Sequence, residues 1–173
     1  MPSHKHIFVK YLNQYFVETG TFEGQGIEYA LDVGFDHVRS VDIDQKSYEA
    51  ALVKFRYNPR VDLYHGPTEV KLQEMIKEIR VPVTFWLDAH WSGEGTPMSD
   101  KKCPLLDELE VIKNHPVKNH TIMIDDIRCC GTDYFDFITK EQLENKIKEI
   151  NPQYVITYED SWEPKDILVA RLS

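Results

Sequence analysis

The sequence predicts an α/β fold in which helices cover both faces of a mostly parallel sheet. Two observations lead to this class. Strand-like apolar segments alternate with helical patterns five times along the chain, and the last two strand-like segments then follow each other with no helix between them. The first pattern is typical of parallel β-α units, and the second is typical of an antiparallel hairpin. We therefore expect a Rossmann-like three-layer sandwich.

The chain is long enough for one domain with a sizeable core, since it has 173 residues. No repeat, low-complexity tract or linker divides it. We expect a single domain over residues 1–173, in which residues 1–14 contain a short helix at 5–14 and residues 15–173 form the core.

Three strand–helix units form the first half of the predicted core. The strands are expected at residues 15–19, 37–42 and 61–65, and the helices at about 24–34, 45–57 and 67–80. Pro67 suits the first turn of the third helix. Apolar residues then recur through that helix at helical spacing.

The second half holds the remaining strands and helices. Strands are expected at 82–88, 120–125, 153–159 and 166–172, and helices from Pro104 onward and at 139–150. The loop 92–102 is polar and contains glycine. Only six residues separate the last two strands, so these should pair antiparallel as a hairpin.

The charge of the chain argues against several classes of partner. A net charge of −9 disfavours binding to nucleic acid or to anionic lipid, because both need a basic surface. No window of about 18 apolar residues suggests a membrane span, and the N-terminus lacks the pattern of a signal peptide. Three cysteines are too few for a disulfide framework. We expect a cytoplasmic protein that binds neither nucleic acid nor membrane.

The first candidate site lies at the end of the first strand. Glu18, Gly20 and Gly24 form the pattern E-x-G-x-x-x-G at the turn into the following helix. Glycines at this point allow a tight turn and the close approach of a ligand to the main chain. Phe22 stands where a dinucleotide-binding loop would have its middle glycine, which disfavours a pyrophosphate ligand. The alternative is an ordinary tight turn.

Two further signals follow the second and third strands. Asp42 ends the second strand, where a carboxylate can accept both hydroxyls of a ribose. The alternative role, capping the next helix, suits Asp44 better. Gly66 closes the third strand, where a glycine would let an adenine ring lie against the backbone. Its alternative is a simple loop glycine.

In this order and at these strand ends, the motifs resemble those of class I S-adenosylmethionine-dependent methyltransferases. The resemblance covers about residues 14–172 and implies seven strands in the order 3-2-1-4-5-7-6. It also implies that the first loop holds the amino-acid part of the cofactor and that Asp42 holds the ribose. The implied cofactor-binding residues are Glu18, Thr19, Gly20, Thr21, Gly24, Asp42, Gly66 and Asp88.

Acidic residues also follow the fourth and fifth strands. Asp88, Asp125 and Asp126 should meet at one edge of the sheet, where crowded carboxylates call for a cation such as Mg²⁺ or Mn²⁺. The alternative is that these acids cap turns and anchor loops. The trio resembles the metal site of O-methyltransferases that act on sugars and macrolide glycosides. The small size of the chain also resembles glycan methyltransferases of large algal viruses.

The expected reaction is methyl transfer to a hydroxyl of a sugar, glycan or similar polyhydroxyl acceptor. His90 is the candidate base and Asp88 the alternative. Trp91 and Arg128 are candidate acceptor contacts, and Trp86 is expected in the core.

Two other functions stay open at this point. A nicotinamide-dependent oxidoreductase is disfavoured by Phe22 and by the terminal hairpin. A catalytically silent domain is disfavoured by the acids at the strand ends. There is little extra chain for a lid, so either the acceptor site is open or a second copy in a homodimer covers it.

Overall fold

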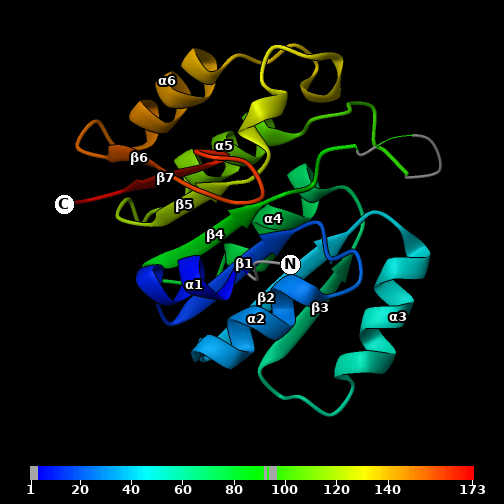
Figure 1. The fold of residues 1–173 in the computed structure, drawn as a ribbon. Helices are drawn as coiled ribbons and strands as arrows, with labels where there is room; N and C mark the ends of the chain where they lie inside the picture. The colour runs from blue at the N-terminus through cyan, green and yellow to red at the C-terminus, as the bar shows by residue number, and fades with distance from the viewer. Residues whose placement is uncertain (1–3, 92, 94–96) are drawn as a thin grey trace.

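One seven-stranded sheet organises the molecule, as the α/β class predicts. The computed structural model describes residues 4–91, 93 and 97–173. The strand order is β3-β2-β1-β4-β5-β7-β6 (Figure 1), which confirms the order implied by the resemblance. The strands are β1 (Tyr15–Thr19), β2 (His37–Asp42), β3 (Val61–His65), β4 (Val83–Leu87), β5 (Thr121–Ile124), β6 (Val155–Glu159) and β7 (Ile167–Arg171).

The strands from β3 to β5 are all parallel, whereas β7 runs antiparallel to both of its neighbours, β5 and β6. The predicted terminal hairpin is therefore confirmed. The carboxyl ends of β1 to β6 all lie at one edge of the sheet. Because β7 runs the other way, its first residues reach this same edge.

Helices cover both faces of the sheet. The helices are α1 (Lys5–Phe8), α2 (Gln25–Val33), α3 (Gln45–Phe55), α4 (Thr68–Ile76), α5 (Leu105–Asn114) and α6 (Lys140–Ile150), and the 3₁₀ turns are η1 (Val9–Tyr11), η2 (Ile127–Cys129) and η3 (Asp133–Phe135). Side chains of α1, α2 and α3 share one buried cluster with Phe16 and Trp86, and side chains of α4, α5 and α6 share the other with Val17 and Phe85. The alternation of strand side chains thus separates two cores. No helix in the described part of the chain is long and apolar enough to cross a membrane.

The N-terminal helix is shorter than the predicted 5–14. It ends at Phe8, continues as a 3₁₀ turn to Tyr11, and becomes extended at Leu12. The Thr84 hydroxyl donates to the Tyr11 carbonyl at 2.6 Å, and Asn13 donates to the Thr84 oxygen at 3.0 Å. These contacts with β4 replace the continued helical bonds. The helix predicted at 67–80 likewise ends early, at Ile76.

A chain of two buried histidines supports the amino-terminal edge of the sheet. The Val83 amide donates to Nδ1 of His120 at 3.1 Å, so Nε2 of His120 carries the proton and faces Nδ1 of His115 at 3.1 Å. Nε2 of His115 can then donate to the carbonyls of Ile76 and Ile79. Burial and the neighbouring His115 lower the pKa of His120 to about 3. The buried imidazole of His120 is therefore neutral, and the hydrogen bonds of the pair tie the start of β4 to the end of α4.

Candidate functional site

A pocket of about 420 Å³ opens at the carboxyl ends of the parallel strands. It receives residues that follow four neighbouring strands: Gly20 after β1, Asp42 at the end of β2, Asp88 after β4 and Asp126 after β5. This is the edge at which open α/β sheets bind ligands. The pocket runs without interruption from the Asp42 side to the Asp126 side, so it can hold two reactants next to each other.

The turn after β1 needs glycine at position 20. Gly20 has φ +89°, and its amide donates to the Val41 carbonyl at 2.9 Å. A Cβ atom at this position would lie 2.6 Å from the Asp88 carbonyl oxygen. The loops after β1 and β4 therefore touch through main-chain atoms. Gly24 also has a positive φ, +75°, and is the N-cap residue of α2.

Glu18 lies behind this turn and is 2% exposed. The Ser40 hydroxyl donates to its Oε2 at 2.6 Å, and the Thr21 and Ser40 hydroxyls are 2.7 Å apart. A Cβ on Gly26 would lie 1.8 Å from the other carboxyl oxygen, Oε1. Burial raises the pKa of Glu18 to about 8, against the opposing hydrogen bond from Ser40. The carboxyl group thus supports the turn from within the core.

The pocket takes in only part of the predicted cofactor set. Gly20, Asp42 and Asp88 line it, and the described lining includes no atom of Glu18, Thr19, Thr21, Gly24 or Gly66. Those five residues form or support the loops around the pocket. Their direct contact with a cofactor stays a prediction.

Asp42 presents its carboxylate to the pocket while it fixes two loops. Its Oδ2 accepts from the Phe22 amide and its Oδ1 from the Asp44 amide, both at 2.8 Å. Asp44 caps α3 by accepting from the amides of Lys46 and Ser47. The expectation that Asp44 rather than Asp42 caps this helix is confirmed. The ribose-binding role of Asp42 stays a prediction.

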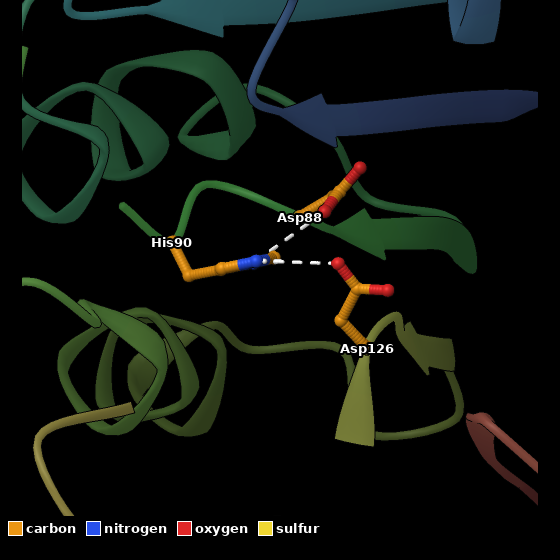
Figure 2. Close-up of side chains that lie close together, drawn as sticks. All are labelled: Asp88, His90 and Asp126. Atoms are coloured by element: carbon orange, nitrogen blue, oxygen red, sulfur yellow. Dashed lines mark ion pairs between the residues drawn. The ribbon is translucent and has the colours of Figure 1, made fainter. Parts of the chain in front are cut away.

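At the other end of the pocket, His90 lies between two carboxylates (Figure 2). Its Nδ1 is 3.6 Å from Oδ1 of Asp88, and its Nε2 is 3.2 Å from Oδ2 of Asp126. Loss of solvent and the charges of Asp125 and Asp126 raise the pKa of Asp88 well above its usual range. Burial alone would raise the pKa of Asp126 too, but His90 and Arg128 outweigh it and the pKa is lowered.

The acidic trio expected from the sequence is divided in space. Donor atoms of Asp88, His90 and Asp126 all lie within 4.8 Å of one another, whereas Asp125 groups with Asp126 and Asp166. Asp125 continues the alternation of β5 toward the face of α1, where its Oδ2 is 3.9 Å from Nε2 of His4. Asp126 has φ +56°, and this left-handed turn sends its side chain toward His90 instead. Burial and the charge of Asp126 raise the pKa of Asp125 to about 7.

Arg128 is held by neighbouring acids. Its guanidinium pairs with Asp126 and Asp166, and its amide donates to Oδ1 of Asp166 at 2.9 Å. The described lining of the pocket does not include Arg128. Its predicted acceptor contact is untested, and the contacts it makes here orient Asp126.

Trp91 lines the pocket, as an acceptor-contacting residue would. Its ring centroid is 5.9 Å from that of Tyr134, and the ammonium group of Lys102 lies 5.0 Å from the centroid of Trp91. Trp86, by contrast, is 2% exposed and belongs to the core, as expected. Of the polar loop expected at 92–102, residues 92 and 94–96 lie outside the described residues.

Three acidic residues near the site were not predicted from the sequence as site residues. Glu69 lines the pocket, and its buried Oε2 has no hydrogen-bond partner among the described residues. Glu108 lies in the core, where it accepts from the Thr68 hydroxyl at 2.5 Å and where burial raises its pKa to about 7. Asp166 holds Arg128. The antiparallel direction of β7 was a usable signal for Asp166, because it places the start of that strand at the site.

No family model matches the sequence, and no curated protein matches it. Solved structures do match. An O-methyltransferase from Bacillus cereus in complex with S-adenosylhomocysteine superimposes with a TM-score of 0.65 and 14% identity, over 100% of this chain and 82% of that chain. The chain has the fold of S-adenosylmethionine-dependent methyltransferases.

Two further structures agree with this fold. TomG, an O-methyltransferase from Streptomyces achromogenes in complex with S-adenosylmethionine, gives a TM-score of 0.63 and 11% identity, over 98% of this chain and 78% of that chain. The Podospora anserina methyltransferase PaMTH1, bound to S-adenosylhomocysteine, gives a TM-score of 0.62 and 15% identity, over 92% of this chain and 72% of that chain. At these identities the similarity extends to the arrangement of the elements and not to an acceptor.

Proposed function

We propose that this protein is an S-adenosylmethionine-dependent O-methyltransferase. The observation that carries the proposal is the continuous pocket at the strand ends, with Asp42 at one end and His90 between two carboxylates at the other. The first end suits a nucleoside, because a carboxylate after the second strand can accept ribose hydroxyls. The second suits an acceptor hydroxyl that must lose a proton.

The cofactor half would be built from three groups. Asp42 has its second lone pairs free for ribose hydroxyls, since each oxygen accepts one backbone amide. Gly20 lets the main chain approach a ligand. Glu69 lines the same pocket, and its carboxylate can accept from an amino group such as the exocyclic amine of adenine.

The reaction would be a direct displacement. Bound S-adenosylmethionine supplies an electrophilic methyl group on sulfur, so the carbon–sulfur bond breaks as the carbon–oxygen bond forms. The acceptor hydroxyl loses its proton to a base, for which His90 is the candidate and Asp88 the alternative. Much of the acceleration would come from holding the two reactants in line within one pocket.

We propose that a divalent cation assists at the second end of the pocket. Two carboxylates and one imidazole nitrogen within 4.8 Å form a plausible ligand set, and the nitrogen favours Mn²⁺ over Mg²⁺. A bound cation would lower the pKa of an acceptor hydroxyl. In that arrangement His90 would be a metal ligand together with Asp88 and Asp126. A histidine that binds the metal would not also accept the proton of the acceptor, so the assignment of His90 as the base applies to the metal-free site.

The acceptor we propose is a sugar, a glycan or a similar small polyhydroxyl compound. Its support is the acidic end of the pocket, which can hold vicinal hydroxyls directly or through a cation, and the partly exposed aromatic ring of Trp91, which can lie against a sugar ring. The net charge of −9 continues to disfavour a nucleic-acid acceptor.

Calorimetric titration with S-adenosylhomocysteine tests the proposal. We expect micromolar binding, and we expect Asp42→Ala to weaken it strongly. Binding of a nicotinamide dinucleotide, with none of S-adenosylhomocysteine, would instead support the oxidoreductase. Absence of binding by either compound would support a catalytically silent domain.

A titration with Mn²⁺ in the presence and absence of EDTA tests the cation separately. If the cluster binds the metal, His90→Gln should weaken that binding while leaving S-adenosylhomocysteine binding unchanged. An acceptor screen with sugars, with and without Mn²⁺, then tests the substrate class.

A further inference from the structure

The loop after β1 carries an aromatic residue between glycines. Phe22 lies between Gly20 and Gly24, and all three have positive φ angles, which for Phe22 is +45°. A left-handed backbone disfavours any residue that has a Cβ atom, and glycine adopts it readily. The loop therefore retains a side chain at a position where glycine would fit the backbone better.

The Phe22 ring gains little from the rest of the chain. The residue is 65% exposed, although an aromatic ring is stabilised mainly by leaving water. Backbone strain and an exposed apolar ring thus coincide at one residue. Strain retained at a pocket is a reason to look for a role in binding.

The position of Phe22 indicates what the ring would contact. Its amide donates to Oδ2 of Asp42 at 2.8 Å, and both residues line the same half of the pocket together with Ile43 and Ser47. Asp42 is the residue assigned to the ribose. One carboxylate therefore fixes the backbone under the ring and faces the nucleoside position.

We propose that the Phe22 ring packs against the nucleoside of the bound cofactor and closes that half of the pocket over it. This inference rests on the proposed function. The ring would exchange contact with water for contact with the ribose and adenine, and the fixed backbone would keep it in place before binding. The side chain at the position of the missing middle glycine then becomes a part of the binding site.

Calorimetry on point variants tests this role. We expect Phe22→Ala to bind S-adenosylhomocysteine about tenfold more weakly than the unmodified protein, which corresponds to about 1.4 kcal/mol. Phe22→Leu should lie between the two, since it keeps apolar bulk. The heat-capacity change of binding should become less negative in Phe22→Ala, because less apolar surface is buried. A change confined to folding would not alter that quantity.

Two variants separate the ring from the backbone. Phe22→Gly releases the strain and removes the ring, whereas Phe22→Ala removes the ring alone, so equal losses of affinity assign the effect to the ring.

Phe137 is the matched control. It has φ +60° and is 64% exposed, but it is not among the described residues that line the pocket, and Phe137→Ala should bind normally.

Two results would overturn the inference: affinity within twofold of the unmodified protein in Phe22→Ala, or the same loss in Phe137→Ala. Either one leaves the proposed function intact, because the unmodified protein still binds S-adenosylhomocysteine. Absence of binding by the unmodified protein would remove both.

Discussion

Glu18 provides a quantitative test of the core beneath the glycine turn. It is 2% exposed, and its pKa is about 8 in the folded protein against a value of 4.5 without the surrounding structure. The folded state therefore holds this proton over a range in which the unfolded state has lost it. The resulting stabilisation is fully present below pH 4.5 and is lost as the pH rises through 8.

The perturbation is Glu18→Gln, which keeps the shape of the side chain and removes its titration. One pH unit between the two pKa values corresponds to about 1.4 kcal/mol. Allowing for partial ionisation near pH 8, the unmodified protein should lose about 2 kcal/mol of unfolding free energy between pH 6 and pH 8 relative to the variant. Other titrating groups affect both proteins equally, so their contribution drops out of the difference in unfolding free energy between the unmodified protein and the variant.

Urea denaturation at pH 6, 7 and 8 measures this difference. Glu141→Gln, at an exposed position in the first turn of α6, is the control and should track the unmodified protein. If the unfolding free energy of the unmodified protein stays constant relative to that of Glu18→Gln between pH 6 and pH 8, or rises relative to it, the reasoning is refuted. It would mean that the folded protein holds Glu18 ionised.

Three other outcomes follow from the geometry. Gly20→Ala places a Cβ 2.6 Å from the Asp88 carbonyl and should abolish S-adenosylhomocysteine binding in calorimetry while circular dichroism stays native. His120→Asn should make the protein less sensitive to acid, because the buried imidazole of His120 stays neutral in the folded state while it is protonated in the unfolded state. Urea denaturation between pH 6 and pH 4 should show that the unmodified protein loses about 1.4 kcal/mol of unfolding free energy per pH unit relative to the variant. Asp126→Asn should weaken Mn²⁺ binding at least tenfold in a metal titration, and an unchanged affinity would dismiss the cluster as its site.

The positions of the strands along the chain were predictable because residues with a local physical role bound them, whereas their order in the sheet was implied by the family resemblance. Gly20 turns the chain sharply, and Asp44 caps the next helix. The extent of the first helix was not predictable in the same way. Its end depends on Thr84, which is far away in sequence and bonds the Tyr11 carbonyl.

The site was predictable to the level of strand ends but not of side-chain direction. Asp125 and Asp126 are adjacent in sequence, but their side chains leave the chain in different directions, so Asp126 meets His90 and Asp125 faces His4. The cluster beside the pocket therefore contains His90 where the sequence suggested Asp125. The antiparallel direction of β7 could have placed Asp166 at this edge of the sheet, but its pairing with Arg128 depends on side-chain directions that the sequence pattern does not give.

The placement of β7 has a consequence for how the chain assembles. This strand lies between β5 and β6, so β6 has no partner in the sheet until residues 167–171 arrive. Asp166, which orients Arg128 beside Asp126, arrives with them. A nascent chain that has delivered β1 to β6 therefore has an open edge at β5 and an unfinished acidic cluster. The exposed edge at β5 is the point at which an incomplete chain is most open to pairing with another chain.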